Sequence, residues 1–143
     1  MFNTVFDVDV IAAGEGETLN FADGDTILHR GAAGDRAFVV KRGMVEIRQK
    51  SRALETIAPG EIFGELSLLD GAPRVAVAVA VGPVEVVAID RPLFTALLRD
   101  DPEFALAIVH RLARRLRATT AMFERCVEEP ARAELRLARP ASA

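Results

Sequence analysis

The feature that most constrains the fold is a series of short apolar runs between Thr18 and Ile89, separated by glycine and proline turns. The runs are rich in Val, Ile, Thr and Phe, which favour extended backbone. In order they are TLNF, DTILH, RAFVVKR, MVEIRQ, ALETIA, RVAVAVAVG and VEVVAI. The turn residues between them are Ala22-Asp23-Gly24, Gly31 to Asp35, Arg42-Gly43, Pro59-Gly60 and Gly82-Pro83. This regular alternation predicts a mainly β fold, an antiparallel β-sandwich or jelly roll.

The periodicity becomes helical after Asp90. Asp90 is a good N-cap for RPLFTALLR, and Asp101 is another, followed by Pro102 at the first helical position. We expect a helix from Pro102 to about Glu128. One side of it carries a seam at alternating spacings of four and three: Ala105, Val109, Leu112, Leu116, Thr119, Phe123 and Cys126. The seam is compatible with packing on the chain's own β domain and with a homodimer through residues 105–126, and leaves both open.

Length and composition favour one folded domain. The chain has 143 residues, of which half are hydrophobic and 27% are charged, as in ordinary globular proteins. We expect a single domain over residues 1–143. It would have a β core at about 18–90, a helical part at about 91–128 and a flexible tail at 130–143.

Composition also disfavours several functions. A net charge of −3 gives no overall excess of basic residues that would favour binding to the phosphates of DNA. One cysteine, Cys126, with only His29 and His110, predicts neither a disulfide nor a metal site, and we expect no cofactor. The longest apolar stretch is too short to span a bilayer, and the N-terminus is unlike a signal peptide, which predicts a cytoplasmic protein. No nucleophile–base pair or carboxylate dyad points to an enzyme.

Glu65 and Arg74 are two of the three charged residues, with Asp70, in the mostly apolar stretch FGELSLLDGAPRVAV. The glycines before Glu65 let backbone approach a ligand closely, and a turn holds Arg74, whose guanidinium can grip phosphate oxygens in a bidentate contact. An ionised Glu65 only accepts hydrogen bonds, so a ribose hydroxyl is a natural partner. No P-loop motif and no acidic cluster for magnesium accompanies them. The alternatives are a metal-free site for a singly charged nucleotide phosphate and a structural Glu–Arg ion pair.

The stretch resembles the phosphate-binding cassette of cyclic-nucleotide-binding domains. The family pattern is Phe-Gly-Glu, a small apolar run, then Pro-Arg and a small residue; this chain has Phe63-Gly64-Glu65-Leu66-Ser67-Leu68-Leu69 and Pro73-Arg74-Val75-Ala76. The resemblance also covers GAAGDRAFVVKRGMVEI and extends more weakly from about Phe21 to Phe123. It implies a jelly-roll β-sandwich with short helices before and after it, the last being a movable lid or dimer helix.

The resemblance assigns a role to individual residues. Glu65 would accept a hydrogen bond from the ribose 2′-hydroxyl, Arg74 would bind the cyclic phosphate, and backbone N–H groups would complete the cage. The implied ligand-binding set in this stretch is Phe63, Gly64, Glu65, Leu66, Ser67, Pro73, Arg74, Val75 and Ala76. Val75 departs from the relatives that carry a hydroxyl residue after the arginine, so that phosphate contact is absent.

A second resemblance lies in ARRLRATT, residues 113–120, which looks like the dimer helix of the bacterial catabolite activator (Crp/Fnr) family. It implies that Thr119 and Thr120 contact the base, one of them from the opposite subunit; the alternative is two threonines that merely lie mid-helix. In that family a helix-turn-helix domain follows. The residues after Glu128 are too few for one, so we expect no direct DNA binding.

These observations predict a regulatory sensor for a cyclic nucleotide, cyclic AMP in preference to cyclic GMP. It would signal through its C-terminal helix, a homodimer interface and an effector protein. Two alternatives remain: an interaction module of the same fold that binds no ligand, and a regulatory subunit or fragment of a Crp/Fnr-like transcription regulator.

Overall fold

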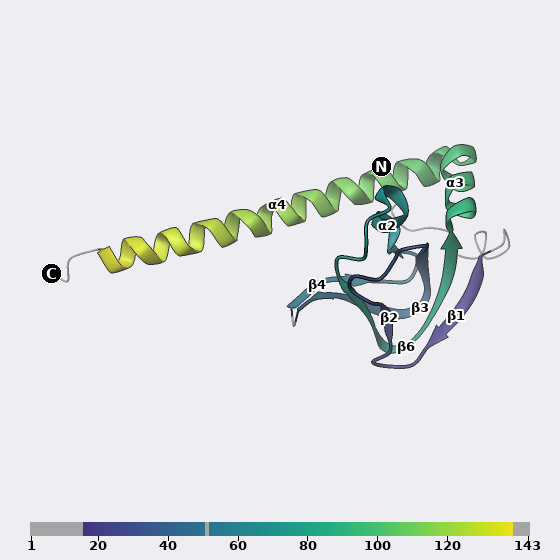
Figure 1. Ribbon diagram of the computed structural model, residues 1–143, viewed down its shortest axis with the longest axis horizontal. Coiled ribbons are helices and arrows are strands. Elements are labelled where there is room, and N and C mark those ends of the chain that lie inside the picture. The colour runs from purple at the N-terminus through teal and green to yellow at the C-terminus, as the bar shows by residue number, and fades with distance from the viewer. Residues whose placement is uncertain (1–15, 51, 139–143) are drawn as a thin grey trace. The chain divides into compact units, whose positions relative to one another are not determined.

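A computed structural model describes residues 16–50 and 52–138, with side chains as far as Val127. The strands are β1 (Glu17–Phe21), β2 (Thr26–Leu28), β3 (Arg36–Gln49), β4 (Arg52–Ile57), β5 (Ile62–Phe63) and β6 (Val77–Asp90). The helices are α2 (Glu65–Asp70), α3 (Arg91–Asp100) and α4 (Pro102–Ala138) (Figure 1). The helix that the resemblance implies before the β core falls outside the described residues.

The strands pair antiparallel around two long ones, β3 and β6. The order is β1-β6-β3-β4, with β2 added to β6 and β5 added to β3. β3 and β6 pair almost along their whole length, from Arg36 opposite Asp90 to Arg48 opposite Val77. This antiparallel architecture with flanking helices confirms the predicted mainly β, jelly-roll sandwich fold.

The predicted turns at Arg42-Gly43 and Gly82-Pro83 are wrong, because both strands continue through them. The β3–β6 register shifts between Val40 and Arg42 and again between Arg42 and Met44, which marks a bulge. Gly43 has a φ of 90°, and a Cβ there would lie 2.3 Å from the carbonyl oxygen of Pro83. Gly43 of β3 and the Gly82-Pro83 pair of β6 therefore lie opposite each other. They bend the β3–β6 pair at a bulge, and neither reverses the chain.

The hydrophobic core lies against the inner side of this bent sheet. Phe38 of β3 and Phe63 of β5 stack at 5.4 Å between ring centroids, and both are buried. Around them lie Val40, Val45, Ile47, Ile57, Ala78, Ala80, Val84, Val86 and Ala88. The short β5 strand, which the sequence did not predict, thus ties the residue before Gly64 to the core.

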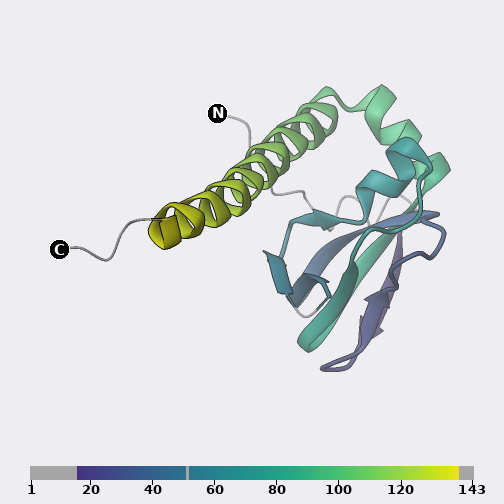
Figure 2. The same cartoon turned by 60° about the vertical axis from the view of Figure 1, so that its left-hand side comes forward.

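The two predicted helix starts are confirmed. The Asp90 carboxylate accepts a hydrogen bond from the N–H of Leu93 at 2.9 Å, and Asp101 accepts from Glu103 and Phe104 at 3.1 and 3.2 Å. Phe94 of α3 and Phe104 of α4 are buried and meet edge to face, with centroids 5.7 Å apart. In Figures 1 and 2, α2 and α3 lie at the same end of the β core.

The chain divides into two compact units, Met1–Ala107 and Ile108–Ala143. α4 runs to Ala138, ten residues beyond the predicted end at Glu128, so residues 130–138 of the predicted tail continue the helix and 139–143 are outside the described residues. Along α4 the seam residues Val109, Leu116 and Phe123 are 62–69% exposed. Within the described part of the chain, every helix is too short or too polar to cross a bilayer.

Candidate functional site

The candidate site starts where β5 passes into α2. Phe63 is fully buried and pairs with Phe38 across the β5–β3 ladder, which fixes the entry to the helix. Gly64 then adopts a φ of 79° and Gly71, at the other end of α2, a φ of 70°. Only glycine adopts this left-handed backbone without strain, so the two glycines set where the helix begins and ends. Glu65, its first residue, is fully buried.

Arg74 approaches the start of α2 from the loop that follows the helix. Its side chain is buried, and its two terminal nitrogens donate to backbone carbonyls: Nη1 to Gly64 at 2.5 Å and Nη2 to Arg36, the first residue of β3. These contacts use two of the five N–H donors of a guanidinium. Arg74 therefore bridges the start of α2 to the sheet and keeps further donors for another acceptor.

The backbone of Arg74 is also held, by the loop that precedes β3. Its N–H donates to the carbonyl of Ala32 at 2.9 Å, and its carbonyl accepts from the N–H of Gly31 at 2.8 Å. The guanidinium is therefore fixed at both its base and its tip. Bidentate recognition of an anion needs a planar guanidinium held in one orientation, and these contacts hold that of Arg74.

The same loop comes close to α2 at Gly34. A Cβ on Gly34 would lie 2.1 Å from the Cβ of Ser67 and 3.0 Å from Cζ of Arg74. A Cβ on Gly64 would likewise lie 2.9 Å from Nη1 of Arg74. Gly34 and Gly64 therefore both permit a close approach to the guanidinium that a Cβ would obstruct.

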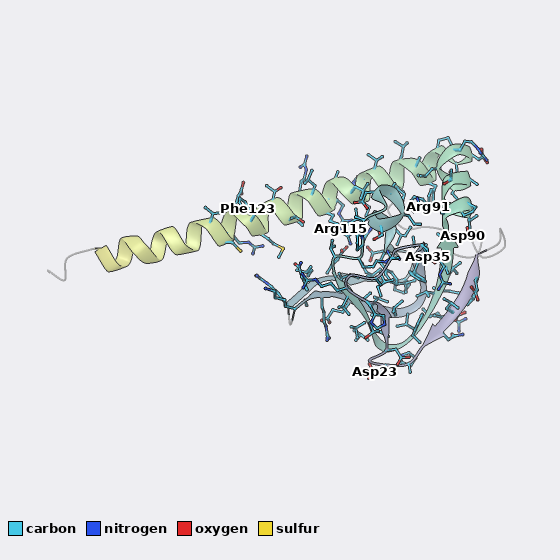
Figure 3. All side chains as sticks on the ribbon, viewed as in Figure 1. Asp23, Asp35, Asp90, Arg91, Arg115 and Phe123 are labelled. Carbon is cyan, nitrogen blue, oxygen red and sulfur yellow. The ribbon has the colours of Figure 1, made fainter. Side chains whose placement is uncertain are left out.

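Charges around Arg74 act in both directions. Burial lowers the pKa of the guanidinium, the negative charges of Asp35 and Glu65 raise it, and Arg36 lowers it again. Asp35 lies in the loop before β3 (Figure 3). An arginine in this setting stays protonated at neutral pH. The site thus holds a permanent, largely desolvated cation close to two carboxylates.

The structure brings together part of the predicted set. The carbonyl of Gly64 accepts from Arg74, Phe63 and Glu65 flank Gly64 in the chain, and Ser67 and Arg74 both lie beside Gly34. Leu66 and Ala76 are half-buried, while Pro73 and Val75 are exposed, Val75 by 63%. Thr119 and Thr120 are exposed on α4, in the second compact unit. The ligand contacts of all these residues remain predictions.

Three residues that hold the candidate site in place were not predicted from the sequence. The carbonyl of Arg36 accepts from Arg74, Gly34 gives room for Ser67, and Arg91 donates to the carbonyl of Leu68 at 2.7 Å. The Gly34-Asp35 pair could have indicated that this loop lies close to α2, because a glycine can allow close packing as well as a turn. A backbone carbonyl carries no residue-type signal.

Residues 18–101 match the family described as the cyclic nucleotide-binding domain. The chain is 32% identical over 108 residues to a CRP-like cAMP-activated global transcriptional regulator of Mycobacterium tuberculosis, covering 72% of this chain and 48% of that protein. It is 38% identical over 102 residues to a cyclic AMP receptor protein of Thermus thermophilus, covering 68% and 47%. The chain therefore spans about half the length of these curated relatives.

Among solved structures, the crystal structure of the Thermus thermophilus catabolite activator protein superimposes with a TM-score of 0.76 at 34% identity. The match covers 87% of this chain and 61% of that chain. The agreement in fold and sequence extends over the β core and the elements that hold Glu65 and Arg74.

Proposed function

Because the chain belongs to the cyclic nucleotide-binding domain family, we propose that it binds cyclic AMP and acts as a regulatory sensor domain rather than as an enzyme. The observation that carries the proposal is the buried guanidinium of Arg74, held by the carbonyls of Gly64 and Arg36 beside the buried Glu65. A desolvated cation with free donors is a strong site for one compact anion. The cyclic phosphate is a single negative charge that needs no metal.

In this proposal Arg74 binds the phosphate oxygens and Glu65 accepts from the ribose 2′-hydroxyl. Backbone N–H groups of Gly64, Leu66, Val75 and Ala76 would complete the phosphate cage. Two acids near the site, Asp35 and Glu65, oppose a second negative charge on the ligand, which favours a cyclic phosphodiester over a phosphomonoester dianion.

Cyclic AMP is proposed in preference to cyclic GMP because both curated relatives named above carry cyclic AMP in their descriptions. Thr119 and Thr120 would contact the base, one of them from a second subunit. The exposed seam of α4 supports a homodimer through residues 105–126, since exposed large apolar side chains at this spacing pack well against a second helix.

The output would pass through α3 and α4 to the dimer partner or to an effector protein in the cytoplasm, without direct DNA contact by these residues. Two other proposals remain beside it. One is a module of this fold that no longer binds a nucleotide. The other is the regulatory part of a longer Crp/Fnr-like regulator, which agrees with the chain spanning about half of its relatives.

Titration of the purified chain with cyclic AMP and cyclic GMP by calorimetry, with oligomeric mass followed by light scattering, tests the proposal. We expect saturable binding of cyclic AMP at one site per chain and weaker binding of cyclic GMP. Ligand at about a hundred times its Kd should stabilise the fold by about 2.7 kcal/mol. Absence of both heat and thermal shift at millimolar nucleotide would leave the ligand-free module as the better proposal.

A further inference from the structure

The first half of β6 reverses the usual pattern of a strand with one solvated face. Ala78 and Ala80 point into the core and are at most 2% exposed. Val77, Val79 and Val81 alternate with them and therefore point to the outer side of the sheet. In antiparallel sheets the outer residues are normally polar. Here the small apolar side chains lie inside and the large ones outside.

The neighbouring strands leave the outer side of this half of β6 partly uncovered. Met44 of β3 lies opposite Val81 and faces the same side, and the two side chains are 38% and 44% exposed. The other two valines are partly exposed and lie opposite Arg48 and Glu46, which form an ion pair at 2.6 Å. Four apolar side chains thus form one surface, which we call the valine face: Val77, Val79, Val81 and Met44.

The valine face lies within the first compact unit and shares no residue with the proposed nucleotide site or with the seam of α4. A preference for extended backbone does not explain it, because threonine also favours strands and would expose no apolar row. Exposed apolar side chains that are rimmed by polar ones are typical of a surface that contacts another protein. The sign of the charges at its two ends indicates which protein that is.

The end of the valine face next to the β3–β4 hairpin is basic. Lys50 and Arg52 are exposed there, beside Arg48. Glu46 offsets only the charge of Arg48, with which it is paired. Glu55 of β4 lies opposite a core residue of β3 and therefore faces the inner side. Three basic residues and one acidic residue border this end, which leaves a surplus of two positive charges.

The other end of the valine face, at the bend of β6, is acidic. The carboxylate of Asp23 accepts a hydrogen bond from the N–H of Gly82 at 2.7 Å, and Asp25 is exposed beside it in the same turn. Figure 3 shows Asp23 at the end of the β core away from α3. Beyond the bend, Glu85 pairs with two basic residues of β3 at 3.6 and 3.8 Å. Three acids and two basic residues leave a surplus of one negative charge here.

We propose that the valine face is a contact with a second copy of this chain, with the two sheets packed face to face and their β6 strands antiparallel. A two-fold axis near Val79 brings the basic end of each copy onto the acidic end of the other. A parallel arrangement would place like charges together. Face-to-face packing of sheets through interdigitated side chains is a common way to bury such a surface, and a two-fold contact uses the same patch twice.

This contact is distinct from the homodimer proposed through α4 and does not depend on a nucleotide. Four side chains make a small interface, so the contact is weak, with a Kd of roughly 0.1–1 mM, and it stays open at micromolar concentration. A dimer formed through α4 carries two valine faces. Such dimers would join into larger assemblies when the local concentration is high.

Sedimentation equilibrium of the full chain in the Leu116→Glu background, which removes the α4 contact, tests the proposal. We expect a monomer–dimer equilibrium at protein concentrations up to about 1 mM. Val79→Lys should weaken it at least tenfold, because two like charges meet at the axis, while Glu46 opposite Val79 accommodates the lysine within each chain. Leu69→Lys is the control, since Leu69 is equally exposed, at 43%, and lies outside the valine face.

A triple variant keeps the strand but removes the apolar surface: Val77→Thr, Val79→Thr and Val81→Thr. It should weaken the association to the same degree as Val79→Lys, with thermal unfolding confirming that the protein is folded. The Leu69→Lys control should stay within twofold of its parent. A monomer at every concentration in the Leu116→Glu background, or equal association of the triple variant and the control, would overturn the proposal.

Cross-linking tests the antiparallel arrangement. In a Cys126→Ser background, chains with Val77→Cys and chains with Val81→Cys are treated with a bismaleimide of about 10 Å, the spacing of stacked sheets. The mixture should give at least threefold more covalent dimer than either variant alone. Val79→Cys, at the axis, should link to itself. Equal yields from the mixture and from each variant alone would refute the antiparallel contact.

Discussion

Replacing Arg74 by alanine should weaken the fold and the ligand site by separate amounts. The buried guanidinium donates to the carbonyls of Gly64 and Arg36, which connect the start of α2 to β3. A buried acceptor left without its donor costs about 1–3 kcal/mol, and two are involved. Water entering the vacated space, and the relief of burying a charge, offset part of this. We expect a net loss of about 2 kcal/mol, or roughly 4–8 °C in Tm for a domain of this size.

The effect on affinity comes on top of the effect on stability. Loss of one charge-assisted partner for the phosphate costs about 1.5–3 kcal/mol, so the Kd for cyclic AMP should rise roughly ten- to a hundredfold or more. Arg74→Lys keeps the charge but presents one ammonium in place of a planar fork. It cannot bridge both carbonyls and still face two phosphate oxygens, so both its Tm and its Kd should lie between those of wild type and Arg74→Ala.

The measurement is calorimetric titration with cyclic AMP at 15 °C, where we expect wild type and all the variants to be folded, together with thermal unfolding of the free proteins. Arg42→Ala is the control, because that arginine is exposed and its pairing with Glu85 at 3.8 Å lies outside the site. An unchanged Kd in Arg74→Ala would remove Arg74 from the ligand site. An unchanged Tm would refute the structural bridge, whatever the Kd.

Four further changes test other parts of the site. Glu65→Gln should reduce the discrimination between cyclic AMP and its 2′-deoxy analogue from about tenfold to threefold or less in calorimetry, because a neutral amide is a weaker acceptor for the ribose hydroxyl; equal discrimination by both proteins counts against the ribose contact. Gly34→Ala should lower the free energy of unfolding in urea by about 1–3 kcal/mol, since the new Cβ would lie 2.1 Å from that of Ser67; adding Ser67→Gly should restore part of the loss, and no restoration would locate the strain elsewhere. Val75→Ser should tighten cyclic AMP binding about two- to tenfold by adding a hydroxyl donor at the phosphate; weaker binding would show that the exposed valine does not border it. Leu116→Glu, at a seam position that is 67% exposed, should convert a dimer to a monomer in light scattering; an unchanged mass would move the interface away from residues 105–126.

Local sequence signals predicted the strands and helix starts well and failed where two strands had to be compared. Gly43 and the Gly82-Pro83 pair have the residue types of turns, and a bulge needs the same types. Only the pairing of β3 with β6 shows that they lie opposite each other, and pairing between residues forty positions apart is not visible in either segment alone. The two-residue β5 was missed for a related reason, because so short a run has no periodicity.

The residues of the candidate site also fall into those that local sequence predicts and those that only the folded chain reveals. That Gly64, Glu65 and Arg74 lie close together could be predicted from residue type and spacing, and their ligand contacts stay predictions. The partners of Arg74 could not be predicted, because Gly64 and Arg36 contribute carbonyl oxygens that every residue possesses. Arg91 likewise reads as an ordinary surface arginine at a helix start, and only the folded chain brings it to the carbonyl of Leu68.

The way Arg74 is held bears on how such a site could signal. Its side chain is bound by two carbonyls, and its backbone by Gly31 and Ala32. A group already oriented loses little conformational freedom when the phosphate arrives, which favours affinity. A ligand can shift a conformational equilibrium only through groups that differ between the two states. In the proposed site a fixed Arg74 would serve as the anchor, and a change on binding would have to come from other elements. The short helix α2 is held at its start by Arg74, through the carbonyl of Gly64, and at its end by Gly71 and Arg91, so a movement of α2 would have to break or carry these contacts.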